Sequence, residues 1–154
     1  VEVQAAFGLV QLGRLQEFNE IRKRNVERLT SFLNDYQDLF MLPSHPKHTD
    51  PSFLSYPITL KDNVPFLRYS LLEHLENNGI QTRLLFAGNI LRHVAYKNIP
   101  HRKAESLANS DKIMKDTFLV GIHQGINNED IDYNRHKQLR SVLNNIIELL
   151  DETI

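Results

Sequence analysis

The chain has 154 residues, of which 41% are hydrophobic and 24% charged, and its formal net charge is −1. This length fits one ordinary domain with a real core, and the charge balance argues against disorder and against a nucleic-acid-binding surface. Cysteine is absent, which excludes disulfides and cysteine-ligated zinc or iron–sulfur sites within these residues. Because no apolar run approaches the ~20 residues that span a bilayer, we expect no membrane contact and a cytoplasmic location.

The first forty residues predict one long helix. Residues 3–12 are apolar on almost every side of a helix, a pattern typical of a helix that is buried all round. We therefore expect residues 1–40 to be a linking helix that packs on a large domain upstream of Val1, and residues 41–154 to be a small domain. The alternative is a start covered by the same domain or by a dimer partner. Further along, the apolar stripe narrows to the spacing of a one-sided helix at Leu15, Phe18, Ile21, Val26, Leu29, Leu33 and Tyr36.

The segment FLSYPITL predicts the first strand, with Leu54, Tyr56, Ile58 and Leu60 on a buried face. Pro57 lacks an N–H group and suits an edge strand or a bulge. A helix is expected next, with Asn63 as cap, Pro65 in its first turn and Asn78-Gly79 as its stop. Its inward positions are predicted to be Leu67, Leu71, Leu72 and Leu75.

Two more strands and two more helices complete the expected order. One strand alternates at Ile80, Thr82, Leu84 and Phe86, and another at Phe118, Val120 and Ile122. A weak helix is expected at about 104–115, and a final helix follows a cap at Asn127. The predicted fold class is α+β: a small, mostly antiparallel sheet of three or four strands with helices on one face, after a long N-terminal helix.

Most patterns that carry chemistry are absent. His45 and His48 have a spacing that could place both imidazoles on one metal ion, but a Pro-flanked loop without a third ligand favours solvated histidines, so no metal is expected. The charged positions of IRKRNVER, which are Arg22, Lys23, Arg24 and Arg28, favour a solvated helical face. The sequence has neither a Gly-rich phosphate loop nor a nucleophile elbow, and no catalytic residue is predicted.

The segment QTRLLFAGNILR is the candidate binding site. Arg83 points either to solvent or into a cleft beside the sheet, because its strand neighbours point into the core. Gly88 permits a backbone bend, and Asn89 can offer an amide to a ligand or cap a turn. Arginine, glycine and asparagine at a strand end suit an anionic or hydroxyl-rich ligand. The alternative is a surface turn in which Arg83 and Arg92 pair with carboxylates.

Three segments resemble one enzyme family. QAAFGLVQLGRLQEF followed by RKRNVERL is similar to the linking helix of nucleotide-sugar aminotransferases and their dehydrase relatives, which are vitamin-B6 enzymes of the aspartate-aminotransferase fold. GIQTRLLFAGNILR and SDKIMKDTFLVGI resemble one branch, the CDP-4-keto-6-deoxyglucose 3-dehydrases of lipopolysaccharide O-antigen synthesis. Leu54 also favours this branch, because the aminotransferases tend to carry a histidine in that strand. Two departures are Val94, where the branch often has proline, and His123-Gln124, where it has Tyr-Pro.

The resemblance implies a reaction that this chain would not perform alone. Pyridoxamine phosphate condenses with the 4-keto group of a CDP-sugar, a histidine acts as base, the 3-hydroxyl leaves, and a reductase partner delivers electrons through an iron–sulfur cluster. The histidine, the pyridoxal or pyridoxamine phosphate and the cluster belong to the large domain, so this chain is expected to bind no cofactor. The enzyme is expected to be a homodimer. The wall that this chain would offer to substrate is Arg83, Phe86, Gly88, Asn89 and Arg92.

Two other functions stay open. The first is the same domain of a sugar aminotransferase, which a lysine at the upstream base position would favour. The second is a stand-alone binding module without catalysis, which the apolar start fits poorly.

Overall fold

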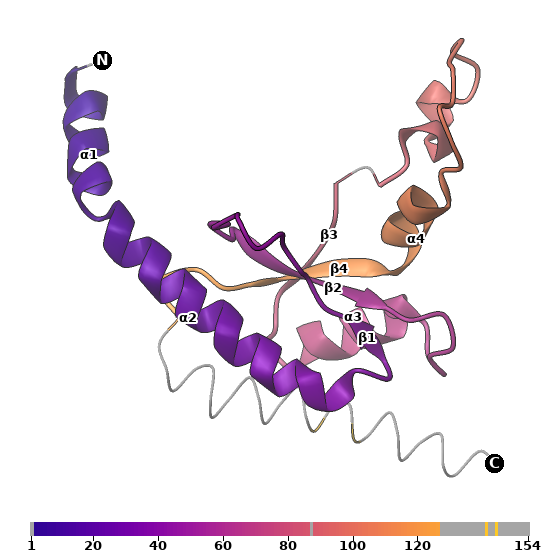
Figure 1. The fold of residues 1–154 in the computed structure, drawn as a ribbon, viewed down its shortest axis with the longest axis horizontal. Helices are drawn as coiled ribbons and strands as arrows, with labels where there is room; N and C mark the ends of the chain where they lie inside the picture. The colour runs from indigo at the N-terminus through magenta and orange to yellow at the C-terminus, as the bar shows by residue number, and fades with distance from the viewer. Residues whose placement is uncertain (1, 87, 127–140, 142–143, 145–154) are drawn as a thin grey trace.

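A computed structural model describes residues 2–86, 88–126, 141 and 144 of the chain. The helix predicted from Asn127 lies outside these residues, apart from Ser141 and Asn144, which are helical. Figure 1 shows a small sheet with α2 and α3 on one side, while α1 and the segment before α4 extend away from it. The elements are α1 (Glu2–Gly13), α2 (Leu15–Leu33), β1 (Phe40–Met41), β2 (Ser55–Leu60), α3 (Arg68–Asn77), β3 (Thr82–Leu84), α4 (Ala108–Asp116) and β4 (Thr117–Gly121), with 3-10 turns η1 (Asn34–Tyr36), η2 (Ile90–Arg92) and η3 (Val94–Tyr96).

The four strands pair antiparallel in the order β1-β2-β4-β3, which confirms the predicted α+β class and sheet. β2 pairs with β4 over five residues, whereas β1 reaches only Thr59 and Leu60. Pro57 lies opposite Leu119 in the part of β2 that β1 does not cover. Its missing N–H therefore costs no ladder hydrogen bond to β1.

The core lies between one face of this sheet and the helices α2 and α3. Tyr56 pairs with Val120 and Ile58 with Phe118, so these side chains share a face, and all four are buried. α4 borders the opposite face, where a shallow cavity is lined by Pro57, Thr59 and Ile113. The buried hydrophobic cluster consists of Leu33, Phe40, Tyr56, Ile58, Leu60, Leu71, Leu75, Ile80, Phe118, Val120 and Ile122.

The predicted alternation is wrong at the strand ends. Leu54 is 77% exposed and precedes β2, and Leu84 and Phe86 are 57% and 91% exposed although Ile80 and Thr82 of the same pattern are buried. Leu84 keeps the core-facing register, opposite Phe118. Its exposure therefore shows that no described helix extends over this end of β3.

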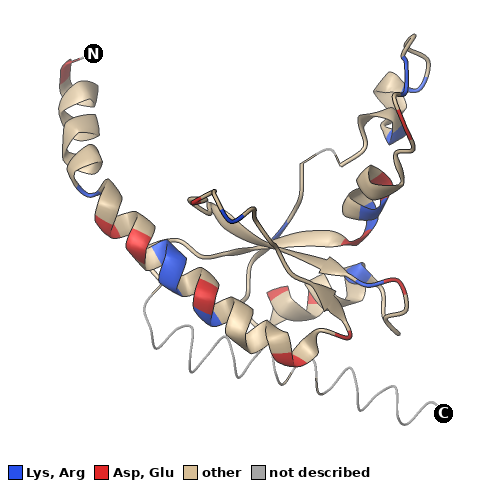
Figure 2. Cartoon of the chain, in the orientation of Figure 1, with Lys and Arg blue, Asp and Glu red and all other residues tan. Residues whose placement is uncertain are grey.

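α1 has no buried residue, although it is apolar on every side. Val3, Phe7, Leu9, Val10 and Leu12 are each between 62% and 71% exposed. In Figure 2, no residue of α1 after Glu2 has the colour of Lys, Arg, Asp or Glu, and the next charged residue along the chain is Arg14 at the bend before α2. Within the described residues, the first predicted half of the long helix therefore lacks the cover that its composition requires.

α2 is fastened to the sheet through polar side chains as well as Leu33. Asn25 is 1% exposed, and its Nδ2 donates to the carbonyls of Ile122 and His123 at 3.3 Å each. On the predicted basic face, Arg22 donates to Gln124, and Lys23, whose side chain is 43% exposed, lies 2.6 Å from Asp50.

α3 begins later than predicted, at Arg68 rather than just after Asn63, and Leu67 is 74% exposed. Arg68 Nη1 donates to the carbonyls of Met114 and Thr117, so the first turn of α3 is tied to the junction of α4 and β4. The predicted stop is confirmed. Gly79 has φ +78°, its N–H donates to Glu76 and that of Ile80 donates to Leu75, which is a Schellman motif.

Between β3 and α4, the chain forms an extended excursion that we call the arm, residues 85–107, of which residue 87 lies outside the described residues. Gly88 places its backbone against Met114 of α4. A Cβ added at Gly88 would lie 2.7 Å from Met114 Cα and would overlap the Met114 side chain, and φ is +60°. Only glycine satisfies both conditions without strain.

Asp111 of α4 holds the arm through two side chains. Its Oδ1 accepts from Asn89 Nδ2 at 2.7 Å and from Arg92 Nε at 2.9 Å, and its Oδ2 accepts from Arg92 Nη2 at 2.5 Å. Asn89 is 4% exposed, and its Oδ1 accepts from Leu91 N–H. The hydrogen bonds from Arg92 and then Asn89 lower the pKa of Asp111 to about 2.

Gly79 and Gly88 both have a positive φ angle, but replacing each with alanine should lower the stability by different amounts. Gly79→Ala should lower the free energy of unfolding by about 1–2 kcal/mol, because backbone strain alone is added and the surrounding space is open. Gly88→Ala should lower it by about 1–3 kcal/mol more, because the new methyl group also collides with Met114. Urea unfolding measures both, and equal losses would contradict the packing at Gly88.

The pKa of Asp111 gives a titration test. Because the pKa lies below the ordinary value of 3.8, ionised Asp111 stabilises the folded arm above about pH 4, and this contribution is lost as the pH falls toward 2. The Asp111 carboxyl carbon should titrate near pH 2 by NMR, and Arg92→Gln should raise the midpoint. Arg83→Gln is the matched control and should leave the midpoint in place. If Arg92→Gln left the midpoint unchanged, the ion pair between Arg92 and Asp111 would be shown not to form.

Candidate functional site

The structure places the five predicted binding residues in two groups. Gly88, Asn89 and Arg92 lie together where the arm meets α4. Arg83 lies on β3, at a separate cavity beside α3, and Phe86 is 91% exposed between the two groups along the chain. The alternative that Arg92 pairs with a carboxylate is confirmed by its ion pair with Asp111.

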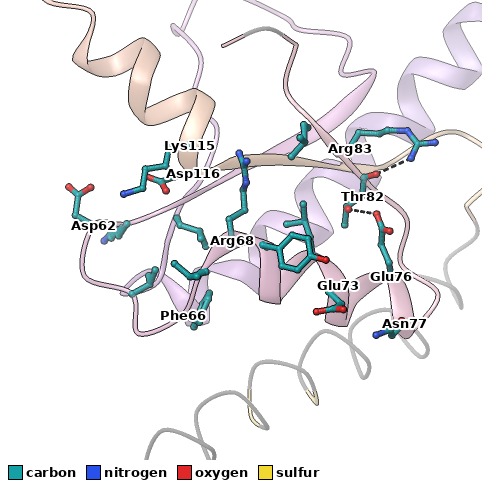
Figure 3. Close-up of a pocket in the computed structure, with 17 residues that line it drawn as sticks. Asp62, Phe66, Arg68, Glu73, Glu76, Asn77, Thr82, Arg83, Lys115 and Asp116 are labelled. Atoms are coloured by element: carbon teal, nitrogen blue, oxygen red, sulfur yellow. Dashed lines mark hydrogen bonds between the residues drawn. The ribbon is translucent and has the colours of Figure 1, made fainter. Parts of the chain in front are cut away.

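The larger cavity has a volume of about 840 Å³ and lies between α3, β3 and the β2–α3 loop (Figure 3). Its charged groups are partly engaged within the protein. Thr82 Oγ1 donates to Glu76 at 2.6 Å, and Arg83 Nη1 donates to the Thr82 carbonyl at 3.1 Å. Across the cavity, Asp62 and Asp116 both bind Lys112, which lowers the pKa of Asp62. Ion pairs inside the domain thus use much of the charge at this cavity.

The smaller cavity has a volume of about 320 Å³ and lies within the arm, next to Ser110 of α4. One side is formed by Gly88, Asn89, Ile90 and Leu91, and the other by 101–104, where three consecutive side chains are basic or imidazole. His101 Nδ1 makes a 2.9 Å hydrogen bond with the Ile99 carbonyl, which orients the ring. This cavity contains two of the predicted residues, Gly88 and Asn89.

Sequence reasoning missed Asp111, which orders the predicted site. In the sequence, Asp111 looks like an acidic residue in the first turn of a helix, where it is favoured by the helix dipole. Its partners lie 22 and 19 residues earlier, and no local pattern indicates that pairing. Arg68 was missed for the same reason, because its two acceptors are main-chain carbonyls more than 40 residues away.

The described residues do not fit the cofactors that the resemblance implies. The pyridine nitrogen of a vitamin-B6 cofactor needs a shielded, available carboxylate, and Asp116, the most buried carboxylate at the larger cavity, is bound by Lys112 at 2.8 Å. An iron–sulfur cluster needs cysteine ligands, and the sequence has none. Across residues 2–86 and 88–126, no group of three or more His, Asp or Glu side chains could hold a metal ion. No helix of this part of the chain is long and apolar enough to cross a membrane.

Comparison with known proteins gives relatives of similar sequence that are much longer than this chain. Lipopolysaccharide biosynthesis protein RfbH of Salmonella typhimurium (strain LT2) is 41% identical over 132 residues, which are 86% of this chain and 30% of that protein. The dTDP-4-dehydro-2,6-dideoxy-D-glucose 3-dehydratase of Saccharopolyspora spinosa is also 41% identical over 132 residues, 86% of this chain and 28% of that protein. The chain therefore spans less than a third of the length of either relative.

Solved structures share the fold. The E. coli GDP-4-keto-6-deoxy-D-mannose-3-dehydratase with bound hydrated PLP has a TM-score of 0.75 and 24% identity, over 90% of this chain and 34% of that one. An aminotransferase from Psychrobacter cryohalolentis has a TM-score of 0.82 and 16% identity, over 94% of this chain and 39% of that one. Since the model of the DegT/DnrJ/EryC1/StrS aminotransferase family matches residues 1–136, the chain belongs to that family.

Proposed function

We propose that this chain is the C-terminal, substrate-covering domain of a nucleotide-sugar 3-dehydrase. One relative at 41% identity is named a 3-dehydratase of a nucleotide sugar, and another is named a lipopolysaccharide biosynthesis protein. We further propose that the sugar carrier is CDP and that the product is a 3-deoxy sugar for O-antigen. This finer identity rests on the residues of TRLLFAGN, because the relatives' names include dTDP and GDP sugars as well.

The observation that carries the proposal is the bare apolar surface of α1. A helix with Phe7, Leu9 and Val10 each at least 62% exposed needs a partner surface in a stable protein. A large domain is the fitting partner, because about seventy per cent of the length of the relatives lies outside the part that this chain matches. In this proposal residues 1–40 link the two domains, and α1 makes the contact while Leu33 of α2 stays in the core of the small domain.

The pyridoxal or pyridoxamine phosphate, bound by the large domain, would supply the carbanion-stabilising chemistry of the reaction. The residues of this chain would close over the nucleotide sugar and exclude water. Phe86 can pack on substrate because its side chain contacts little of its own domain, and Arg83 can reach sugar or phosphate oxygens from β3. The iron–sulfur cluster, the reductase partner, the homodimer and the cytoplasmic location belong to the same proposal.

A sugar aminotransferase is the second candidate, and an aminotransferase from Psychrobacter cryohalolentis shares the fold. Leu54 favours the dehydrase. It is 77% exposed, so its side chain points away from its own core and is available to border a cofactor held by another domain. An apolar residue there cannot make the hydrogen bond that a histidine would make.

Cofactor binding tests the proposal that the large domain, and not this chain, binds the cofactor. We expect the full-length protein that carries this chain to bind pyridoxamine phosphate. The isolated Val1–Ile154 chain should show no binding in equilibrium dialysis, because the described carboxylates at the larger cavity are exposed or engaged. Tight binding by the isolated chain would contradict the proposal.

Phe7→Ser tests the contact of α1 through its dependence on context. In the full-length protein it should lower the free energy of unfolding by about 3 kcal/mol, because a buried aromatic side chain is lost. In the isolated chain it should change the stability little, because Phe7 is already 70% exposed. Leu33→Ala is the control, since a core leucine should cost about 2–5 kcal/mol in both proteins. Equal effects of Phe7→Ser in the two proteins would refute docking of α1 on the large domain.

A further inference from the structure

The arm is a mostly cationic segment, in which Glu105, near its end, is the one carboxylate. From Arg83 to Ala104 the sequence has no Asp or Glu, and Glu105 is the first acidic residue after it. In Figure 2, Lys and Arg positions, coloured blue, occur at intervals along the arm, which extends away from the sheet. A basic segment on an exposed arm favours an anionic ligand. Its four cations are Arg92, Lys97, Arg102 and Lys103, and Arg83 lies just before it on β3.

Arg83 and Arg92 already have partners within the domain. Arg92 donates hydrogen bonds from two nitrogen atoms to the Asp111 carboxylate, and this ion pair also raises the pKa of Arg92. Arg83 donates from Nη1 to the Thr82 carbonyl. A ligand phosphate would have to compete with Asp111 for Arg92, and taking it would break one of the two side-chain contacts that hold the arm on α4.

Arg102 and Lys103 are placed differently. Both line the smaller cavity, opposite the backbone of residues 88–91. Among the described residues, neither side chain has a hydrogen-bond or ion-pair partner. Asp111 lies near enough to Lys103 for an electrostatic interaction, but its oxygens are already occupied by Arg92 and Asn89. The cavity therefore presents two uncommitted cations beside a carboxylate that is already neutralised.

We propose that Arg102 and Lys103 form the subsite for the pyrophosphate of the nucleotide sugar. This inference rests on the proposed function and names the residues that hold the anionic part of its substrate. Arginine offers a planar fork for phosphate oxygens, and lysine adds a compact point charge. The volume of about 320 Å³ is at the lower end for ligand sites, so it suits the pyrophosphate rather than the whole nucleotide sugar. Arg92 is then a positioning residue, which holds the arm so that the cavity keeps its shape.

Binding of inorganic pyrophosphate and of CDP to the full-length protein tests the subsite. By isothermal titration calorimetry, the double variant R102A/K103A should bind pyrophosphate at least about tenfold more weakly, because two charge-assisted contacts are lost. Its binding should also depend less steeply on salt concentration. Lys97→Ala is the matched control, because it removes a cation from the same arm outside the cavity, and it should change the affinity less than twofold. Affinities of R102A/K103A within twofold of the unchanged protein would overturn the proposal.

Two further measurements separate this inference from the proposed function. Cofactor absorbance and thermal unfolding of R102A/K103A should match those of the unchanged protein. If they differ, R102Q/K103Q provides a second variant, whose side chains are closer in shape to the original ones. If the protein binds cofactor and dehydrates its substrate but R102A/K103A has an unaltered KM, the subsite is wrong and the function stands. If the protein binds no cofactor but R102A/K103A still loses pyrophosphate binding, the function is wrong and the anion subsite stands.

Discussion

The contact of Asp111 with Asn89 and Arg92 determines where the arm lies, and with it the positions of the candidate binding residues on the arm. The ion pair alone is half solvated, with 63% of the Arg92 side chain exposed, and exposed pairs of this kind stabilise proteins only modestly. Asn89 is different because it is 4% exposed, and a buried amide that loses its partner keeps the full cost of desolvation. The buried amide therefore fixes the geometry, and the arginine adds charge complementarity. Gly88 allows this approach because its missing side chain leaves room for Met114.

The two halves of the N-terminal helical stretch have opposite surroundings that follow from their patterns. α2 has a one-sided stripe, and its Leu33 and Asn25 are buried against the sheet. α1 is apolar all round and buries nothing within the described residues. The apolar pattern thus changes from all-round to one-sided at Arg14, where the first charge after Glu2 appears and the helix bends. In the function that we propose, α1 packs on a surface outside this domain.

Local patterns predicted the elements that have one dominant face. Alternation located β2 and β4, and Asn78-Gly79 located the end of α3, because both signals depend on neighbours within a few residues. The same alternation failed at Leu84, since periodicity gives the direction of a side chain but not how far a covering helix extends. The candidate site was only partly predictable. Gly88 and Asn89 were identified as special, whereas Asp111 was not, because a pairing across about twenty residues leaves no periodic signal.

A charged residue that holds the fold together is a poor choice for holding a ligand. The family resemblance placed Arg92 in the substrate wall, yet its guanidinium is bound by Asp111 at 2.5 and 2.9 Å. Arg102 and Lys103 have no hydrogen-bond or ion-pair partner among the described residues, so an anion can bind them without breaking a contact of the domain. The arm thus separates the two uses of positive charge. One cation fixes its position, and two others, about ten residues later, stay available at the cavity that this position creates.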